Sequence, residues 1–451
     1  MSTAIVWFRN DLRLTDNPAW AAATAEHDRV AALFVVDPPL WSSGGRRTDL
    51  LAGHLRSLDA SLAERGGRLT VRRGDPVRIV TDVARHLSAA VYANRDVSPY
   101  AARRDAAVAA ALGGGLHGFE GRWVHGPGRV VTGRGEPYRV FTPFHKQWQA
   151  LAWDRWPDPG DAAVDGDPGE GVPDAPPSPM SPGEDAAADR LGRFLEAADR
   201  YDEDRDRPDR EGTSRLSIDL KFGTIAARRV AAETGDGTPG RRAFVRQLAW
   251  RDFYAQVLLA HPGTVRSALR PEYDGIAWAD DPEGLEAWQA GRTGYPIVDA
   301  GMRQLRAEGW MHNRVRMITA SFLVKDLLVD WRLGERHFRR LLLDADPAQN
   351  VGNWQWVAGT GADAAPYFRI FNPVAQGRRF DPDGDYVRRW VPELAQAPAS
   401  WIHAPWEVSG GDLAAAGVVL GDTYPHPIVD HAVAREATLA AYAAARAGAV
   451  G

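Results

Sequence analysis

The chain has 451 residues, including 45 Gly and 31 Pro, a share too small for a low-complexity sequence, so we expect a folded protein of two or three domains. The absence of cysteine excludes disulfides, thiolate metal sites and cysteine nucleophiles. A formal net charge of −5 and a pI near 6.2 argue, as chain averages, against a nucleic-acid partner. The 17 tryptophans outnumber the 14 phenylalanines and 11 tyrosines, which indicates a use for indole beyond packing.

Short apolar runs alternate with helical patterns over roughly the first 131 residues. The apolar run Ala4–Phe8 is too short for a signal peptide or a membrane span, so we expect a cytoplasmic protein without membrane contact. Alternating elements predict a doubly wound, Rossmann-like parallel sheet, which binds ligands where its strands end. The expected strands are Ala4–Phe8, Val30–Val36, Leu69–Arg72 and Ala89–Tyr92, and the expected helices are Leu50–Arg65, Pro76–Leu87 and Ala101–Leu112.

The segment Pro157–Asp185 differs in composition from both flanks. It holds eight Pro, five Gly and eight acidic residues without Lys or Arg, so it cannot bury enough apolar surface to fold alone. We therefore expect an α/β domain (1–131), an interdomain linker (132–185) and a mainly helical domain (186–451). The expected helices of the last are Ala186–Arg200, Arg241–His261, Ile297–Glu308, Met311–Trp331 and Gly334–Asp344.

One helix of this third part carries a polar and aromatic stripe. Gln247, Trp250, Arg251 and Tyr254 share one side of the helix Arg241–His261. If exposed, the stripe offers stacking, amide hydrogen bonds and a phosphate contact, which suit a nucleobase. A helix packed by its aromatic residues fits the same pattern.

Further on, polar residues gather in otherwise apolar surroundings. Arg314 and Arg316 flank a face formed by Asn313 and Met317, and they need anionic partners if they are buried. A solvated first turn fits this pattern equally. The carboxylates of Asp344-Ala345-Asp346 lie at the end of the expected helix Gly334–Asp344, where the helix dipole disfavours them, so they suggest a ligand. A metal site is the weaker interpretation because no histidine is near.

Two more features suggest a cofactor. Gly212–Ser217 offers hydroxyls, backbone amides and an arginine that suit a pyrophosphate, although Gly-Thr-Ser turns are also common helix caps. Ten of the 17 tryptophans lie between Trp250 and Trp406, among them Trp278, Trp331, Trp354 and Trp356.

Six motifs occur along the chain: Trp7–Leu14, Gly212–Ser217, Trp250–Tyr254, Thr293–Ala300, Gly309–Arg314 and Asn353–Trp356. Taken together, they resemble the photolyase/cryptochrome family, and most closely its class I cyclobutane pyrimidine dimer photolyases. The match runs from Ala4 to about Ala445 with all motifs in family order.

This resemblance implies an antenna domain followed by a helical domain that binds FAD, and a reaction in which light drives an electron from reduced flavin to a dimer flipped out of UV-damaged DNA. It implies no obligate protein partner, and we expect a monomer. The implied FAD ligands are Tyr201, Thr213, Ser214, Arg215, Leu216, Ser217, Arg316, Asp344, Ala345, Asp346 and Asn350. The implied chain of tryptophans that carries electrons is Trp354, Trp331 and Trp278. The implied DNA and lesion contacts are Arg205, Gln247, Trp250, Arg251, Tyr254, Asn313, Arg314, Met317 and Trp356.

Three positions, compared with the patterns of photolyases and cryptochromes, refine the expected activity. Gln247 stands where characterised dimer photolyases usually carry glutamate, so the residue lacks a carboxyl proton to donate. The sequence Met311–Asn313 lacks the pair of histidines of (6-4) photolyases, which disfavours that reaction. Asn350 matches the asparagine beside the flavin, where plant cryptochromes carry aspartate.

The resemblance extends to a second, antenna chromophore. The sequence Asp96–Tyr100 is more similar to the deazaflavin-binding branch than to the branch that binds methenyltetrahydrofolate, whose Asn-Glu pair is missing near Tyr100. We therefore expect a deazaflavin near Arg47 and Asp96, with an empty crevice as the alternative.

Two other functions remain open. The first is a cryptochrome-type blue-light photoreceptor without efficient repair. Three features argue against it: Asn350, the pair Trp250 and Trp356, and the short tail His431–Gly451. The second is a generic flavin-binding electron carrier, which would not need these aromatic residues.

Overall fold

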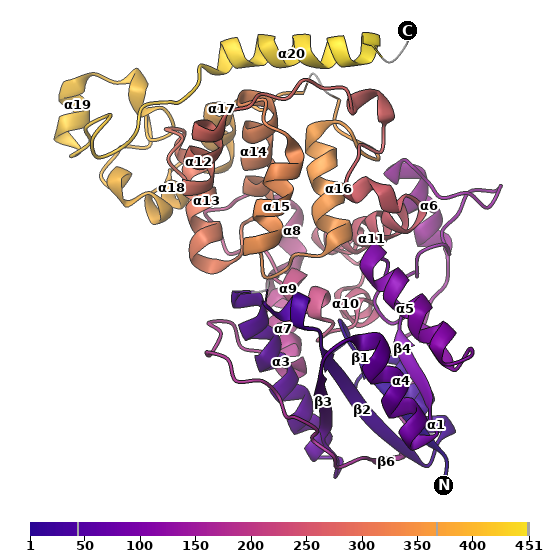
Figure 1. Cartoon of the computed structure of the whole chain (residues 1–451). Coiled ribbons are helices and arrows are strands. Elements are labelled where there is room, and N and C mark those ends of the chain that lie inside the picture. Colours follow the sequence, from indigo (N-terminus) through magenta and orange to yellow (C-terminus); the bar gives the residue numbers. More distant parts are fainter. Residues whose placement is uncertain (43–44, 367–368, 449–451) are drawn as a thin grey trace. The chain divides into compact units, whose positions relative to one another are not determined.

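The structure, a computed structural model, describes residues 1–42, 45–366 and 369–448. The chain forms two compact units, of which the first contains Met1–Asp199 and Ser214–Pro262, and the second contains Arg200–Thr213 and Gly263–Gly451. Figure 1 shows a sheet with its helices in the first unit and helices alone in the second. The predicted fold class is therefore confirmed.

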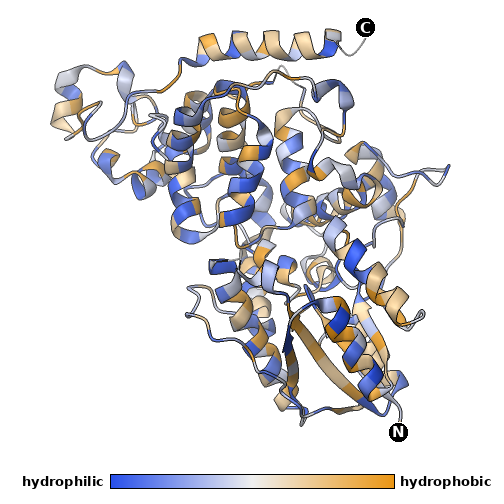
Figure 2. Ribbon diagram, viewed as in Figure 1, coloured by the Kyte–Doolittle hydropathy of each residue, from blue (hydrophilic) through white to orange (hydrophobic). Residues whose placement is uncertain are grey.

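The first unit is built on a parallel sheet with the order β3-β2-β1-β4-β5. The central strands are buried and hydrophobic, as Figure 2 shows, because helices cover a parallel sheet. The four predicted strands are present, whereas β5 and β6 are too short to stand out in the sequence. The strands are β1 (Thr3–Phe8), β2 (Arg29–Val36), β3 (Leu69–Arg73), β4 (Ala90–Asn94), β5 (Leu116–Phe119) and β6 (Ala163–Val164).

Local signals explain several helices of this unit. The side chain of Asp75 accepts a hydrogen bond from the backbone of Arg78 at 2.8 Å, and Pro76 is the first residue of α4, as the sequence predicts. The helices are α1 (Pro18–Glu26), α2 (Pro38–Ser42), α3 (Arg46–Ala63), α4 (Pro76–Leu87), α5 (Pro99–Ala111), α6 (Phe141–Ala150), α7 (Glu184–Ala197), α9 (Ser217–Phe222), α10 (Ala227–Thr234) and α11 (Pro239–Ala260).

The acidic, proline-rich segment belongs to this first unit rather than only bridging two domains. Its strand β6 pairs in parallel with β2, and Asp167 forms an ion pair with Arg72 at 2.8 Å. The two compact units do not coincide with the predicted boundaries 1–131, 132–185 and 186–451. The reason is that α11 packs against α6 and α10 and so belongs to the first unit. Those boundaries stay a prediction about domains.

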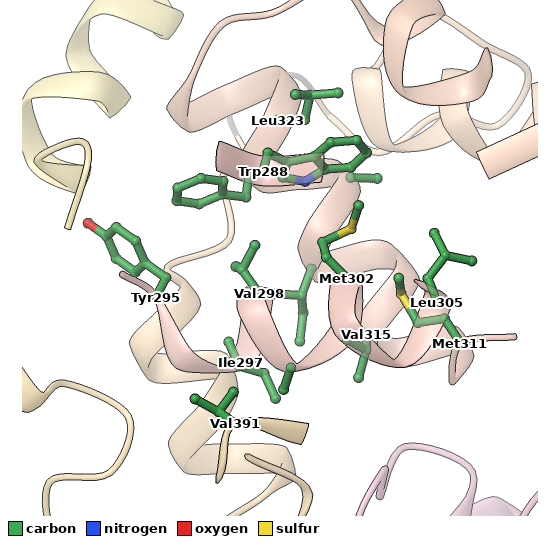
Figure 3. Packing of buried hydrophobic residues seen from close by; sticks show 14 of the residues in the cluster. Trp288, Tyr295, Ile297, Val298, Met302, Leu305, Met311, Val315, Leu323 and Val391 are labelled. Atoms are coloured by element: carbon green, nitrogen blue, oxygen red, sulfur yellow. The ribbon is translucent and has the colours of Figure 1, made fainter. Parts of the chain in front are cut away.

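The second unit is helical around a large buried core. Figure 3 shows Trp288, Val298 and Met302 in this core, where α13 packs against α12 and α14. The helices are α8 (Tyr201–Asp204), α12 (Pro282–Ala290), α13 (Pro296–Glu308), α14 (Asn313–Ser321), α15 (Trp331–Leu341), α16 (Pro347–Ala358), α17 (Pro373–Phe380), α18 (Asp385–Trp390), α19 (Gly410–Ala415) and α20 (His431–Gly448).

The single helix predicted over Met311–Trp331 is wrong. α14 ends at Ser321 and continues as a π-helical turn, η4 (Phe322–Asp326), which is fully buried. Leu328 then takes a left-handed φ of 51°, and the side chain of Asp330 caps α15 by accepting from the backbone of Arg332 at 2.9 Å. Trp331 therefore begins a new helix, a break that apolar periodicity alone does not reveal.

Candidate functional site

In the first unit, β1 and β4 are neighbours although they are not consecutive, so the strand order reverses between them. Such a switch point is where doubly wound sheets bind ligands. Charged and polar side chains follow both strands there. Asn10 donates to Asp96 at 3.1 Å, and Arg9 pairs with Asp105 at 2.7 Å.

Asp96, one of the two predicted antenna residues, is tied into this network. It pairs with Arg122 at 2.5 Å and accepts a hydrogen bond from the backbone of Ser98 at 2.8 Å. Burial alone would raise the pKa of Asp96, but Arg122 and the other donors hold it below its usual range. The carboxylate is thus charged and already engaged. Arg47, the other predicted antenna residue, is half-buried in the first turn of α3.

The aromatic part of the stripe on α11 is preorganised. Trp250 stacks on Phe141 of α6 with ring centroids 3.7 Å apart and planes 7° apart, and the Arg246 guanidinium lies 5.3 Å from the Phe141 centroid. Trp250 remains half-buried. No sequence pattern points to Phe141, since only the tertiary fold brings α6 to α11.

Part of the stripe is packed, as the alternative interpretation of the pattern allows. Arg251 is buried and donates to the carbonyl oxygens of Arg122 and Leu220 at 2.5 and 3.0 Å, and Tyr254 is buried too. Its neighbour Asp252 accepts from His125 and Trp148 at 2.9 Å, and burial raises the pKa of Asp252 to about 7. Arg251 therefore anchors α11 instead of facing a DNA phosphate.

The predicted phosphate loop spans the boundary of the two units in sequence. In the first unit, Arg215 has a left-handed φ of 54°, the side chain of Ser214 accepts from the backbone of Leu216 at 3.2 Å, and Ser217 begins α9. In the second unit, Tyr201 is buried at the start of α8. A positive φ is uncommon for a non-glycine residue and is often found at a functional site, so it draws attention to this turn before α9.

An ion pair marks the predicted flavin contact in the second unit. Nη1 and Nη2 of Arg316 donate to the two oxygens of Asp344 at 3.1 and 2.8 Å, and the Asp344 side chain is only 3% exposed. Asp346 was predicted to lie at the unfavourable C-terminal end of a helix, but it lies at the favourable N-terminal end of α16. It caps α16 and accepts from the backbones of Ala348 and Gln349 at 3.0 and 3.2 Å. Ala345 lies between them, half-buried.

Asn350 lies in the first turns of α16, where the sequence places a flavin contact. Its amide nitrogen donates to the backbone and side-chain oxygens of Glu335 at 3.1 and 2.9 Å. Burial raises the pKa of Glu335. Glu335, which the sequence did not single out, therefore fixes the orientation of the Asn350 amide.

The start of α14 carries the predicted lesion edge. Asn313 is exposed, and its amide nitrogen lies 3.8 Å from the sulfur of Met317. Arg314 pairs with Asp206 at 2.8 Å. Arg205, predicted to contact DNA, is half-buried in the same segment as Asp206, with its guanidinium 5.5 Å from the Tyr201 ring centroid.

The predicted tryptophans of the second unit differ in burial. Trp354 and Trp331 are 2% and 1% exposed, whereas Trp278 and Trp356 are half-buried. Trp354 contacts Trp288 and Phe338, with centroid distances of 6.1 and 5.0 Å. Trp288 and Phe338 thus extend the aromatic cluster, although neither was a sequence candidate. Trp278 contacts Tyr442 of α20 edge to face at 6.2 Å.

Within the described ranges, no helix is long and apolar enough to cross a membrane. The same part of the chain contains no group of three or more His, Asp or Glu side chains arranged to hold a metal ion.

Comparison with known proteins places these features in a class. Residues 4–160 match DNA photolyase, and residues 244–444 match the FAD binding domain of DNA photolyase. A Rossmann-like sheet and a helical FAD-binding domain define a two-part flavoprotein of the photolyase type. The chain belongs to the DNA photolyase family, because relatives named deoxyribodipyrimidine photo-lyase match it over its whole length.

Two such relatives come from Agrobacterium fabrum and Escherichia coli. They are 43% and 42% identical, covering 98% and 99% of this chain and 98% and 100% of theirs. A solved class III photolyase from Agrobacterium tumefaciens is 42% identical with a TM-score of 0.90, covering 99% of this chain and 98% of its own. The particular likeness to class I therefore stays a prediction.

A solved Synechocystis cryptochrome is 28% identical with a TM-score of 0.90, covering 98% of this chain and 99% of its own. The backbone fold is therefore common to a photolyase and a cryptochrome. The fold does not distinguish repair from signalling, so the distinction depends on the side chains at the site.

Proposed function

We propose that this protein repairs cyclobutane pyrimidine dimers in UV-damaged DNA with the energy of light, as a deoxyribodipyrimidine photo-lyase. The observation that carries the proposal is the full-length match to relatives of that name at 42–43% identity. Asn350 and the half-buried Trp250 and Trp356 are the side chains that the family resemblance assigns to the flavin and the lesion.

The residues present fit FAD. Arg316 and Asp344 form a fixed, buried pair that offers donors and an acceptor, and Asn350 is oriented by Glu335. In our proposal Asp344, Ala345 and Asp346 meet the polar edge of the flavin and the ribose. The phosphates and the ribityl chain are held by Tyr201, Thr213, Ser214, Arg215, Leu216 and Ser217. Bound FAD supplies, in its light-excited reduced form, the electron that splits the dimer.

The remaining site residues bind and position the lesion. Trp250 and Trp356 offer ring faces to the dimer, since every base has a face that stacks. Gln247, Asn313 and Met317 contact its polar edge. Arg205 and Arg314 contact backbone phosphates, whereas Arg251 and Tyr254 support Trp250 from the interior of the first unit. A flipped-out base is needed because the dimer is otherwise out of reach of the cofactor.

Trp354, Trp331 and Trp278 conduct electrons inward in this proposal. Trp354 and Trp331 are buried, which shields an oxidised indole from water, and the half-buried Trp278 can exchange electrons with solvent. The residues therefore suit the stepwise transfer that the resemblance implies.

We also propose an antenna chromophore at the switch point of the sheet. Deazaflavin is our first candidate, with Arg47 as the ligand to test because Asp96 is already engaged by Arg122. A Sulfolobus tokodaii photolyase, 33% identical with a TM-score of 0.85, was solved with two FAD molecules, so a second FAD is the alternative. Mass spectrometry of chromophores released from purified protein distinguishes deazaflavin, FAD and an empty crevice.

Repair is tested directly. Reduced protein is mixed with an oligonucleotide that contains one thymine dimer, illuminated with blue light without oxygen, and assayed for restored thymines; a dark sample is the control. We expect restoration only in the light. Absence of repair by fully reduced protein overturns the proposal and favours the photoreceptor, which the likeness to the Synechocystis cryptochrome supports. A cytoplasmic monomer completes the proposal, and its mass in solution tests the monomer.

A further inference from the structure

Arg314, at the first turn of α14, is held by a carboxylate from a distant part of the sequence. Its Nε and Nη2 atoms donate to the two oxygens of Asp206 at 3.2 and 2.8 Å. Its guanidinium also lies 4.4 Å from the ring centroid of Phe380. This two-point geometry matches the way arginine binds phosphate.

The pair is accessible enough to exchange partners. The side chain of Asp206 is 34% exposed and that of Arg314 is 17% exposed. Asp206 thus keeps contact with solvent, and the pair is less buried at its carboxylate than the Arg316–Asp344 pair, whose Asp344 side chain is 3% exposed.

The histidine next to Arg314 cannot take over the carboxylate at neutral pH. His312 lies next to Arg314, and its Nδ1 accepts from the Arg314 backbone at 3.2 Å. Burial lowers the pKa of His312 to about 4, against the opposing charge of Asp206, so the ring is neutral at pH 7. When Arg314 turns to an incoming phosphate, His312 therefore does not neutralise Asp206.

We propose that Asp206 acts as an internal substitute for a DNA phosphate: it holds Arg314 in the free protein and competes with the backbone for it. This inference rests on the proposed DNA contact of Arg314. A phosphate must displace the carboxylate, which weakens binding to every DNA backbone, damaged or not. Because undamaged sites far outnumber lesions, weaker backbone binding shortens the time spent on undamaged DNA.

The test compares two substitutions that change the net charge equally. Asp206→Asn removes the competitor and keeps the side-chain shape. Asp202→Asn removes an exposed acid of α8 in the same segment and serves as the control. Affinities for duplexes with and without a dimer are measured from low to moderate salt, and thermal unfolding checks that both variants fold.

We expect Asp206→Asn to bind both duplexes about fivefold more tightly at 0.1 M salt, with a slope of log K against log salt steeper by about one. Asp202→Asn should change affinity less than about twofold. In an Arg314→Gln background, Asp206→Asn should give no gain, because the competitor acts through Arg314.

Three results would overturn the inference. They are equal gains in DNA affinity from Asp206→Asn and Asp202→Asn, a gain in affinity that persists with Arg314→Gln, and no gain in affinity at all. The repair assay on the wild-type protein is read separately. Repair with no effect of Asp206→Asn refutes only this inference, whereas loss of light-dependent repair with the expected affinity changes refutes only the proposed function. A protein that binds neither duplex refutes both.

Discussion

Gln247 is the residue whose chemistry departs furthest from the family resemblance. Its amide nitrogen donates to the carbonyl of Ala243 on its own helix at 2.8 Å. A glutamine can still offer a donor and an acceptor to a thymine edge, but it has no acidic proton. A glutamate at this position has one to give.

We therefore predict that Gln247→Glu raises the number of dimers repaired per absorbed photon. General acid catalysis by a positioned carboxyl group is commonly worth about 10²-fold or more in rate, and the yield rises as ring splitting competes better with charge return. The measurement is repair against absorbed light, with Gln247→Met as a control that lacks both the proton and the hydrogen bonds. An unchanged yield would contradict the prediction.

Arg316 illustrates a residue whose removal harms both stability and cofactor binding. Arg316→Met leaves the buried carboxylate of Asp344 without its partner, so the free energy of unfolding should fall by about 3–5 kcal/mol. Flavin absorbance after gel filtration should fall with it. Arg336→Met, a change at an exposed arginine of α15, serves as the control. Wild-type stability with lost flavin would show that the pair acts only on the cofactor.

At the scale of elements, α15 approaches Trp354 as closely as it does only because residue 334 is glycine. A Cβ atom there would overlap Cη2 of Trp354 and lie 2.6 Å from Cδ2 of Leu323. The glycine thus admits the indole ring against the helix backbone, which is a packing requirement and not a matter of backbone freedom.

Gly334→Ala should therefore lower the free energy of unfolding by about 1–3 kcal/mol, because the core has no room for the added methyl group. Gly192→Ala in α7 is the matched control: the site is exposed with open space around it, so alanine should stabilise the helix by about 0.5–1 kcal/mol. Urea unfolding measures both. Effects of the same sign would show that the overlap is relieved elsewhere.

The packing of α20 against η4 buries a lysine. The Lys325 ammonium lies 3.7 Å from the ring centroid of Tyr442, whose hydroxyl donates to the carbonyl of Ala358 at 2.7 Å. The side chain of Thr438 donates to the Lys325 backbone at 2.6 Å. Burial lowers the pKa of Lys325 to about 7. Nearby Asp326, which pairs with His431 at 2.5 Å, has its pKa raised by burial to about 6 and so titrates in a lower range.

The sign of the pH effect follows from proton counting. Between pH 7 and about 10 the folded state binds fewer protons at Lys325 than the unfolded state, so stability rises with pH. We predict a rise in the free energy of unfolding of up to about 2–3 kcal/mol from pH 7 to 9, which Lys325→Met removes. The exposed Lys146→Met should keep it. A flat wild-type profile over this range would be inconsistent with a buried, titrating Lys325.

Over the whole molecule, the net charge is a poor guide to the partner. The eight acids of Pro157–Asp185 account for the sign, since the rest of the chain carries +3. Some of these acids have local duties, such as Glu184, which accepts from the backbones of Leu14 and Thr15 at 3.0 and 3.1 Å. Charges act on DNA only over about a Debye length, so their position counts more than their sum.

Neutralising Asp158, Asp161 and Asp174, which are exposed, tests this view. The triple change to asparagine moves the net charge from −5 to −2. We predict that DNA affinity at physiological salt stays within about twofold of wild type, because solvated charges are screened beyond roughly 8 Å. A gain in DNA affinity as large as that expected for Asp206→Asn would show that the net charge of the chain controls DNA binding.

The sequence by itself determined the fold class, most strands and several helices of the first unit, and the family, because these depend on local periodicity and on motifs. α4 is the clearest case, since its cap and first proline lie next to each other in the chain. Tertiary structure alone decided which polar residues face outward. Arg251 is buried against carbonyls from Arg122 and Leu220, and Arg314 is paired with Asp206, because burial and partners depend on residues more than thirty positions away in the sequence.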